Sequence, residues 1–159
     1  MSDASTAPGF ELSLLLLLGF RTLIDELHSR LAVVGHPDAR PMHGFVCQAV
    51  GLEGASAVQV GQRLGISKQA AGKLIAALEQ AGYVTREPDG RDARRKLVRL
   101  SARGRDFLAR STEIFDELRG DWAAVLGEER MGALEDDLRR VTAGASGRLL
   151  DIPGWFARG

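Results

Sequence analysis

The segment from residue 57 to residue 82 constrains the fold of this 159-residue chain most, because it predicts two short helices joined by a tight turn. Gly65 stands where the turn needs a positive φ, which a residue without Cβ adopts at no steric cost. Ser67 is a natural N-cap for the second helix, and Gly82 ends that helix. Gly61 allows close approach of the helices, and five apolar residues can lock them together: Val60, Leu64, Ile66, Ala71 and Leu74. The pattern is typical of a helix-turn-helix.

The residues that follow predict a β-hairpin, or wing. Tyr83 to Glu87 and Lys96 to Leu100 have the composition of two strands, and a turn is expected between them. Asp92 is expected to brace Arg94 within the wing. The turn chemistry comes from Pro88, Asp89 and Gly90, and the basic residues on or next to the loop are Arg91, Arg94, Arg95 and Lys96.

Positive charge is concentrated in this central region. The chain has 21 Lys and Arg and 21 Asp and Glu, yet residues 62–105 hold eleven of the basic residues and only four of the acidic ones. The region therefore carries a net charge of +7, and the remainder carries −7. Because phosphates attract such a surface, a basic helix-turn-helix with a wing indicates double-stranded DNA as the partner.

The start of the second helix offers side chains that can read base edges. Leu74 and Leu78 point inward, one turn apart, so the residues near the start of the helix can face a groove. Gln69 can form two hydrogen bonds with adenine, and Ala70 can touch a thymine methyl group. The alternative is a solvated helix face. The predicted DNA-contacting residues are Ser67, Lys68, Gln69, Ala70, Gly72, Lys73, Arg86, Arg91, Arg94, Arg95 and Lys96.

Long helices are predicted on both sides of this region. From Phe10 to Val34, apolar residues recur every three or four positions along one face. Further leucines widen this face so far that one surface contact would not cover it, so we expect packing within the subunit and against a partner. The apolar residues concerned are Leu14, Leu15, Leu16, Leu17, Leu18, Phe20, Leu23, Ile24, Leu27 and Leu31.

Three more helices complete the prediction. A short helix runs from Met42 to Val50, Ser101 caps a helix that runs through Leu126, and a last helix covers Glu128 to Leu150. The apolar tail that follows is expected to dock. The expected organisation is a flexible N-terminus (1–9), an N-terminal dimerisation helix (10–34), a winged helix-turn-helix domain (40–100), and C-terminal dimerisation helices with a docked tail (101–159). The predicted fold class is mainly α with a two-stranded β wing.

The run from Leu64 to Gly104 resembles the signature of MarR-type winged-helix regulators. Its diagnostic parts are Leu78, Glu79 and Gly82 at the end of the second helix, Asp92 and Arg94 in the wing, and Leu100, Ser101 and Gly104 after it. The resemblance covers the flanking helices more weakly. Ala70 and Gly72 depart from it, because many relatives carry Ser or Thr at these positions.

The resemblance implies an obligate homodimer that binds a palindromic operator and regulates transcription, most often by repression. It implies release from DNA by a small phenolic or lipophilic effector, or by an oxidant. It assigns base contacts to Lys68, Gln69 and Lys73, and insertion of the wing to Arg94, with Arg91 nearby.

Several residues are candidates for sensing. An effector pocket between the dimerisation helices and the winged domain is expected to involve Phe20, His43, Phe45, Cys47, Phe115 and Trp122, although each could simply fill the core. Cys47 is expected to be structural, and the alternative is an oxidant sensor. His43 and Cys47 lie four residues apart, but without a recognisable third and fourth ligand they do not predict a metal site. No cofactor is expected.

Other classes of protein fit the sequence less well. The flanking helices lack a nucleotide-binding loop, a metal set and a nucleophile with its base, so an enzyme is not expected. Leu14 to Leu18 is far shorter than the ~20 residues that span a bilayer, and the acidic Asp3 and Glu11 do not suit a secretory signal. A lone cysteine fits a reducing compartment, so the expected location is the cytoplasm. An architectural or protein-binding winged helix with little sequence preference remains an alternative.

Overall fold

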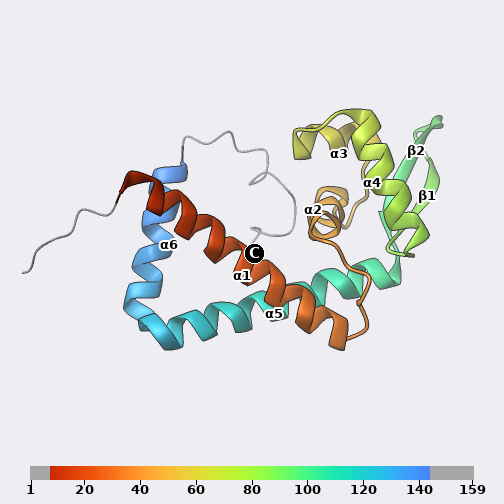
Figure 1. The fold of residues 1–159 in the computed structure, drawn as a ribbon. Helices are drawn as coiled ribbons and strands as arrows, with labels where there is room; N and C mark the ends of the chain where they lie inside the picture. The colour runs from red at the N-terminus through yellow and green to blue at the C-terminus, as the bar shows by residue number, and fades with distance from the viewer. Residues whose placement is uncertain (1–7, 144–159) are drawn as a thin grey trace, which may run out of the picture.

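The computed structural model describes residues 8–143, and Figure 1 shows their arrangement. Six helices and one two-stranded antiparallel sheet make up this part of the chain, which confirms the predicted fold class. In chain order the elements are α1 (Gly9–Val33), α2 (Pro41–Val50), α3 (Ala57–Leu64), α4 (Lys68–Gln80), β1 (Val84–Asp89), β2 (Asp92–Leu100), α5 (Ala102–Leu126) and α6 (Glu128–Thr142). Among these residues, no helix is both long and apolar enough to cross a membrane.

The elements form two parts, which we call the stem and the winged lobe. The stem consists of α1, α5 and α6, with α1 lying across α5 and α6 turning back from its far end (Figure 1). The winged lobe consists of α2, α3, α4 and the hairpin of β1 and β2. The chain passes between the parts twice, in the loop between α1 and α2 and at the junction of β2 with α5.

One hydrophobic core runs through both parts. Leu27 and Leu31 of α1 and Ile114 of α5 belong to the same buried cluster as Ile75 and Leu78 of α4. The cluster continues through Tyr83 and Phe107 at the boundary between the lobe and the stem. The two parts therefore share packed side chains as well as two covalent connections.

The turn between α3 and α4 follows the sequence prediction closely. Gly65 adopts the left-handed conformation at φ 70° and ψ 29°. A Cβ on Gly61 would lie 2.9 Å from the carbonyl oxygen of Ile66, so only glycine allows this close approach. The Ser67 hydroxyl accepts a hydrogen bond from the Ala70 amide at 3.1 Å and fixes the start of α4.

The wing differs from its prediction. The chain reverses at Gly90 and Arg91, whereas Pro88 and Asp89 lie within β1. Arg94 lies in strand β2, as do Arg95 and Lys96, instead of in a loop. Pairing with β1 and a bridge from Ala55 to Val98 extend β2 beyond its local preference, and proline is tolerated because β1 is an edge strand.

The first half of α1 is largely uncovered in the single chain. Leu15 is 58% exposed and Leu16 48% exposed, whereas the second half of the helix buries Leu27 and Leu31 against the core. The other large apolar residues exposed on this half are Phe10, Leu12, Leu14, Leu17, Leu18 and Phe20. We call these eight residues the leucine face. The predicted last part of the final helix and the predicted docking of the tail lie outside the described residues.

Candidate nucleic-acid interface

The start of α4 presents a polar face to solvent. Lys68, Gln69 and Lys73 are exposed, and Ala70 is half-buried. A Cβ placed on Gly72 would meet no atom within 4 Å, so the surface there is open. The opposite face of the helix buries Ala71, Ile75 and Leu78, while Leu74 is only partly buried. A solid apolar face thus holds α4 in place while its polar face stays accessible.

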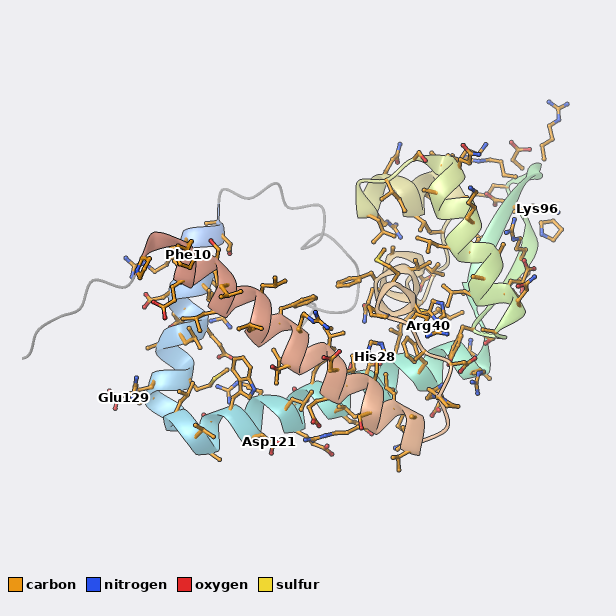
Figure 2. All side chains as sticks on the ribbon, in the orientation of Figure 1. Phe10, His28, Arg40, Lys96, Asp121 and Glu129 are labelled. Carbon is orange, nitrogen blue, oxygen red and sulfur yellow. The ribbon has the colours of Figure 1, made fainter. Side chains whose placement is uncertain are left out.

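The outer part of the wing carries exposed cations whose backbone is fixed by carboxylates. The Asp89 carboxylate accepts a hydrogen bond from the amide of Arg91, and the Asp92 carboxylate accepts one from the amide of Arg94, both at 3.0 Å. The prediction that Asp92 braces the side chain of Arg94 is therefore wrong in its atoms, because Asp92 binds the backbone instead. The guanidinium groups of Arg91 and Arg94 remain directed to solvent, and Figure 2 labels Lys96 on the same hairpin.

Two other arginines of the wing are engaged inside the protein. Arg86 lies 3.0 Å from the carboxylate of Glu79, a pair that ties β1 to the end of α4. Arg99 lies 3.1 Å from the carboxylate of Glu87 on the neighbouring strand. Arg86 belongs to the predicted DNA-contacting set, and its partner gives it a second, structural role.

Six cations of the basic region show no ion pair and no side-chain hydrogen bond within the described part of the chain. They are Lys68, Lys73, Arg91, Arg94, Arg95 and Lys96. All six are exposed and come from α4, β2 or the turn before β2. Positive charge that no nearby carboxylate neutralises is available to an anionic partner.

A polar cavity of about 520 Å³ lies between the wing and the loop after α2, and sequence analysis missed it. Arg91, Arg95 and Arg99 line one side, and Glu53 and Gln59 lie on the other. The loop reaches β2 at Ala55, whose amide and carbonyl both bond Val98. Neither contact is visible in the sequence, because the paired residues lie more than forty positions apart.

The six predicted effector-pocket residues fall into two groups. His43, Phe45 and Cys47 lie on α2, with His43 and Cys47 buried. Phe20, Phe115 and Trp122 lie on the stem, where Trp122 packs beside Gly19. A second cavity, of about 300 Å³, is lined by other residues: Arg30, Val33, Val34, Arg110, Glu113, Ile114 and Glu117. The predicted pocket stays a prediction.

Cys47 is fully buried, and burial raises the pKa of its thiol to about 12. At pH 8 only about one molecule in ten thousand would then carry a thiolate, the form that reacts. We expect a maleimide to leave the native protein unmodified and to modify it once in denaturant, as followed by intact mass. Leu52→Cys is the control, because Leu52 is 76% exposed. Rapid modification of native Cys47 would contradict this expectation and revive the sensor hypothesis.

The fold and the basic surface together define a winged helix-turn-helix protein. Residues 46–95 match the model of the MarR family. The chain belongs to the MarR family, which is one of transcription regulators and not of enzymes, and the resemblance inferred from the sequence is confirmed. A search of curated proteins found no match.

Solved structures share the fold over most of the chain. A mutant of MepR from Staphylococcus aureus, bound to an oligodeoxyribonucleotide, is 20% identical with a TM-score of 0.58, over 83% of this chain and 96% of that one. YusO from Bacillus subtilis is 17% identical with a TM-score of 0.64, over 85% and 94%. PcaV from Streptomyces coelicolor, in complex with its natural ligand, is 23% identical with a TM-score of 0.62, over 91% and 98%.

Proposed function

We propose that this protein is a homodimeric DNA-binding transcription regulator that acts in the cytoplasm, occupies a palindromic operator and represses transcription. The observation that carries the proposal is the set of six unpaired, exposed cations on α4 and the wing. Arg86 and Arg99, in contrast, are paired with carboxylates. Sequence-specific binding requires that base contacts come from one element and phosphate or groove-width contacts from another, and α4 and the wing fit these two roles.

The homodimer follows from the leucine face and from the geometry of DNA. An uncovered apolar surface of this size on a helix is an interaction surface. A second copy would cover it and would bring two α4 helices toward successive major grooves, ~34 Å apart. A palindrome is then the matching target, because each half-site meets one copy of the same side chains.

Release by a small lipophilic or aromatic effector is the second part of the proposal. Relatives of the same fold include PcaV with its natural ligand and MepR bound to ethidium bromide. A ligand between the stem and the winged lobe would change the separation of the two α4 helices, and with it the affinity for DNA. The oxidant-sensing alternative is disfavoured by the burial and raised pKa of Cys47.

Substitutions in α4 and in the wing are expected to have different effects. Gln69→Ala should weaken binding to the operator by about 1 to 3 kcal/mol and relax discrimination at one base pair of each half-site, with little effect on random DNA. Arg94→Ala should weaken binding to both duplexes. It should also make the salt dependence shallower by about one unit of slope per lost phosphate contact in each subunit.

The measurement begins with selection of a target from a pool of random duplexes. Each variant is then titrated against that duplex and a scrambled one at several salt concentrations. Ser13→Ala on α1 serves as the control, because this exposed residue lies far from the wing in sequence and on another element. Recovery of no preferred duplex from the pool would favour an architectural winged helix. Loss of non-specific binding in Gln69→Ala, with Arg94→Ala unaffected, would reverse the assigned roles.

A further inference from the structure

Tyr83 is a fully buried residue at the boundary between the winged lobe and the stem. It follows α4 directly, and its amide donates a hydrogen bond to the carbonyl of Leu78 in the last turn of that helix. Its own carbonyl accepts a hydrogen bond from the amide of Ser101, at the start of α5. Tyr83 is therefore attached to the recognition helix on one side and to the stem on the other.

The hydroxyl of Tyr83 binds the loop by which the chain enters the lobe. It donates a hydrogen bond to the carboxylate of Asp38 at 2.8 Å, and it lies 3.2 Å from Nδ1 of His36. Burial and the neighbouring Asp38 carboxylate raise the pKa of Tyr83, so the hydroxyl keeps its proton. Burial alone would raise the pKa of Asp38, but hydrogen bonds from Tyr83 and Arg103 bring the pKa below its ordinary value.

The same hydroxyl is linked to α5, by which the chain leaves the lobe. Arg103 donates hydrogen bonds to the Tyr83 hydroxyl at 3.3 Å, to Asp38 at 2.8 Å and to the carbonyl of Gly35 at 3.1 Å. Nε2 of His36 lies 3.0 Å from the carboxylate of Asp106, also on α5. One hydroxyl thus joins the end of α4 to both connections between the lobe and the stem.

Small rotations at this point have large effects at the DNA-contacting end of α4. The 13 residues of α4 make a helix ~20 Å long, with Tyr83 just beyond its last residue and Gln69 near its first. A tilt of ~10° about the Tyr83 end would move the other end by roughly 3 Å, close to the ~3.4 Å rise of one base pair. Because a dimer has two such helices, the spacing between half-sites depends on this angle.

We infer that the hydroxyl of Tyr83 is a positioning group that fixes the angle between the winged lobe and the stem, and thereby sets which half-site spacing the dimer accepts. The inference rests on the proposed function for its second part only. The aromatic ring has a separate role in packing, since it lies 5.1 Å from the ring of Phe107 and 5.6 Å from that of His36, centroid to centroid. Tyr83→Phe removes the hydroxyl and keeps this packing.

The angle can be tested without DNA. Spin labels are attached at Ala77→Cys on α4 and Val125→Cys on α5, both exposed positions, while the native Cys47 is buried. We expect a narrow distribution of label distances within one chain, measured with labelled chains diluted in unlabelled protein. Tyr83→Phe should broaden this distribution. Ser111→Ala is the matched control: it also removes a buried hydroxyl, but one that bonds only the Phe107 carbonyl of its own helix.

The second experiment uses the palindromic duplex recovered from the random pool, with one or two base pairs inserted or deleted at its centre. The native protein should prefer one spacing by ~10-fold or more over its neighbours, and Tyr83→Phe should reduce this preference to ~3-fold or less, as expected for loss of one buried hydrogen bond. Ser111→Ala should keep the native preference. A double-mutant cycle with Asp38→Ala should be non-additive, because both changes remove the same contact.

The outcomes separate the inference from the proposed function. Unchanged distances in Tyr83→Phe would overturn the positioning role whatever the DNA result. Broadened distances with an unchanged spacing preference would overturn the link to the operator. Broadened distances in a protein that selects no duplex would support the positioning role and count against the proposed function. Where Tyr83→Phe fails to fold, Arg103→Gln replaces it, because that side chain is 39% exposed and bonds the same hydroxyl.

Discussion

Leu16→Glu should convert the protein into a folded monomer that no longer binds its operator. In the single chain Leu16 is 48% exposed, so a charge there is tolerated. In the proposed dimer it would be buried without a partner, at a cost of several kcal/mol, and twofold symmetry places the change in both copies. We therefore expect the dimer dissociation constant to rise by about a thousandfold or more. Sedimentation velocity measures the assembly, and circular dichroism checks that the helices are retained.

Leu23→Glu is a less discriminating variant, because Leu23 already packs against the core of its own chain. It should both misfold and dissociate. Ser29→Glu is the matched control, since it places the same charge on an exposed position of α1 beyond the leucine face. If Leu16→Glu sediments as the native protein does and binds DNA equally well, the leucine face does not form the dimer.

Gly104→Ala should destabilise the junction of the wing with α5 severely. A Cβ on Gly104 would lie 2.0 Å from the carbonyl oxygen of Tyr83 and 3.1 Å from its carbonyl carbon, and backbone atoms cannot rotate away as a side chain can. Relief requires α5 to separate from the end of α4, which would break the hydrogen bond from Ser101 to Tyr83. We expect a loss of about 3 kcal/mol or more in the free energy of unfolding.

Chemical denaturation of Gly104→Ala and Gly120→Ala makes the comparison within one helix. Gly120 is exposed on α5, and a Cβ there would meet no atom within 4 Å. Gly120→Ala should therefore stabilise the protein by up to about 1 kcal/mol through helix propensity alone. Equal stability of the two variants would mean that α5 and Tyr83 do not approach as closely as described here.

Much of the winged lobe could be predicted because local residues determine its turns. Gly65 and Ser67 specify the break between α3 and α4, and Ser101 caps α5 with a hydrogen bond from Gly104, all within a few positions in sequence. The extent of the wing could not be predicted in this way. Pro88 and Arg94 have turn-like neighbours, yet pairing across the hairpin and with Ala55 draws both into strands.

The electrostatics of the candidate site were only partly predictable. Sequence analysis identified the basic region, but composition does not tell which cations are already paired. Arg86 finds Glu79 across the α4–β1 corner, whereas Arg94 finds no carboxylate for its guanidinium within the described residues. The contacts of Tyr83 join residues as far apart in sequence as Asp38 and Arg103, and no local pattern announces them.

The separation of the leucine face from the wing has a genetic consequence. Figure 1 places the first half of α1 at the opposite end of the molecule from β1 and β2. A chain with a damaged wing keeps its leucine face and, in the proposed homodimer, still pairs with an intact chain. In a cell that holds both alleles, such a chain would inactivate its normal partner and behave as dominant. A chain with a damaged leucine face would pair with nothing and behave as recessive.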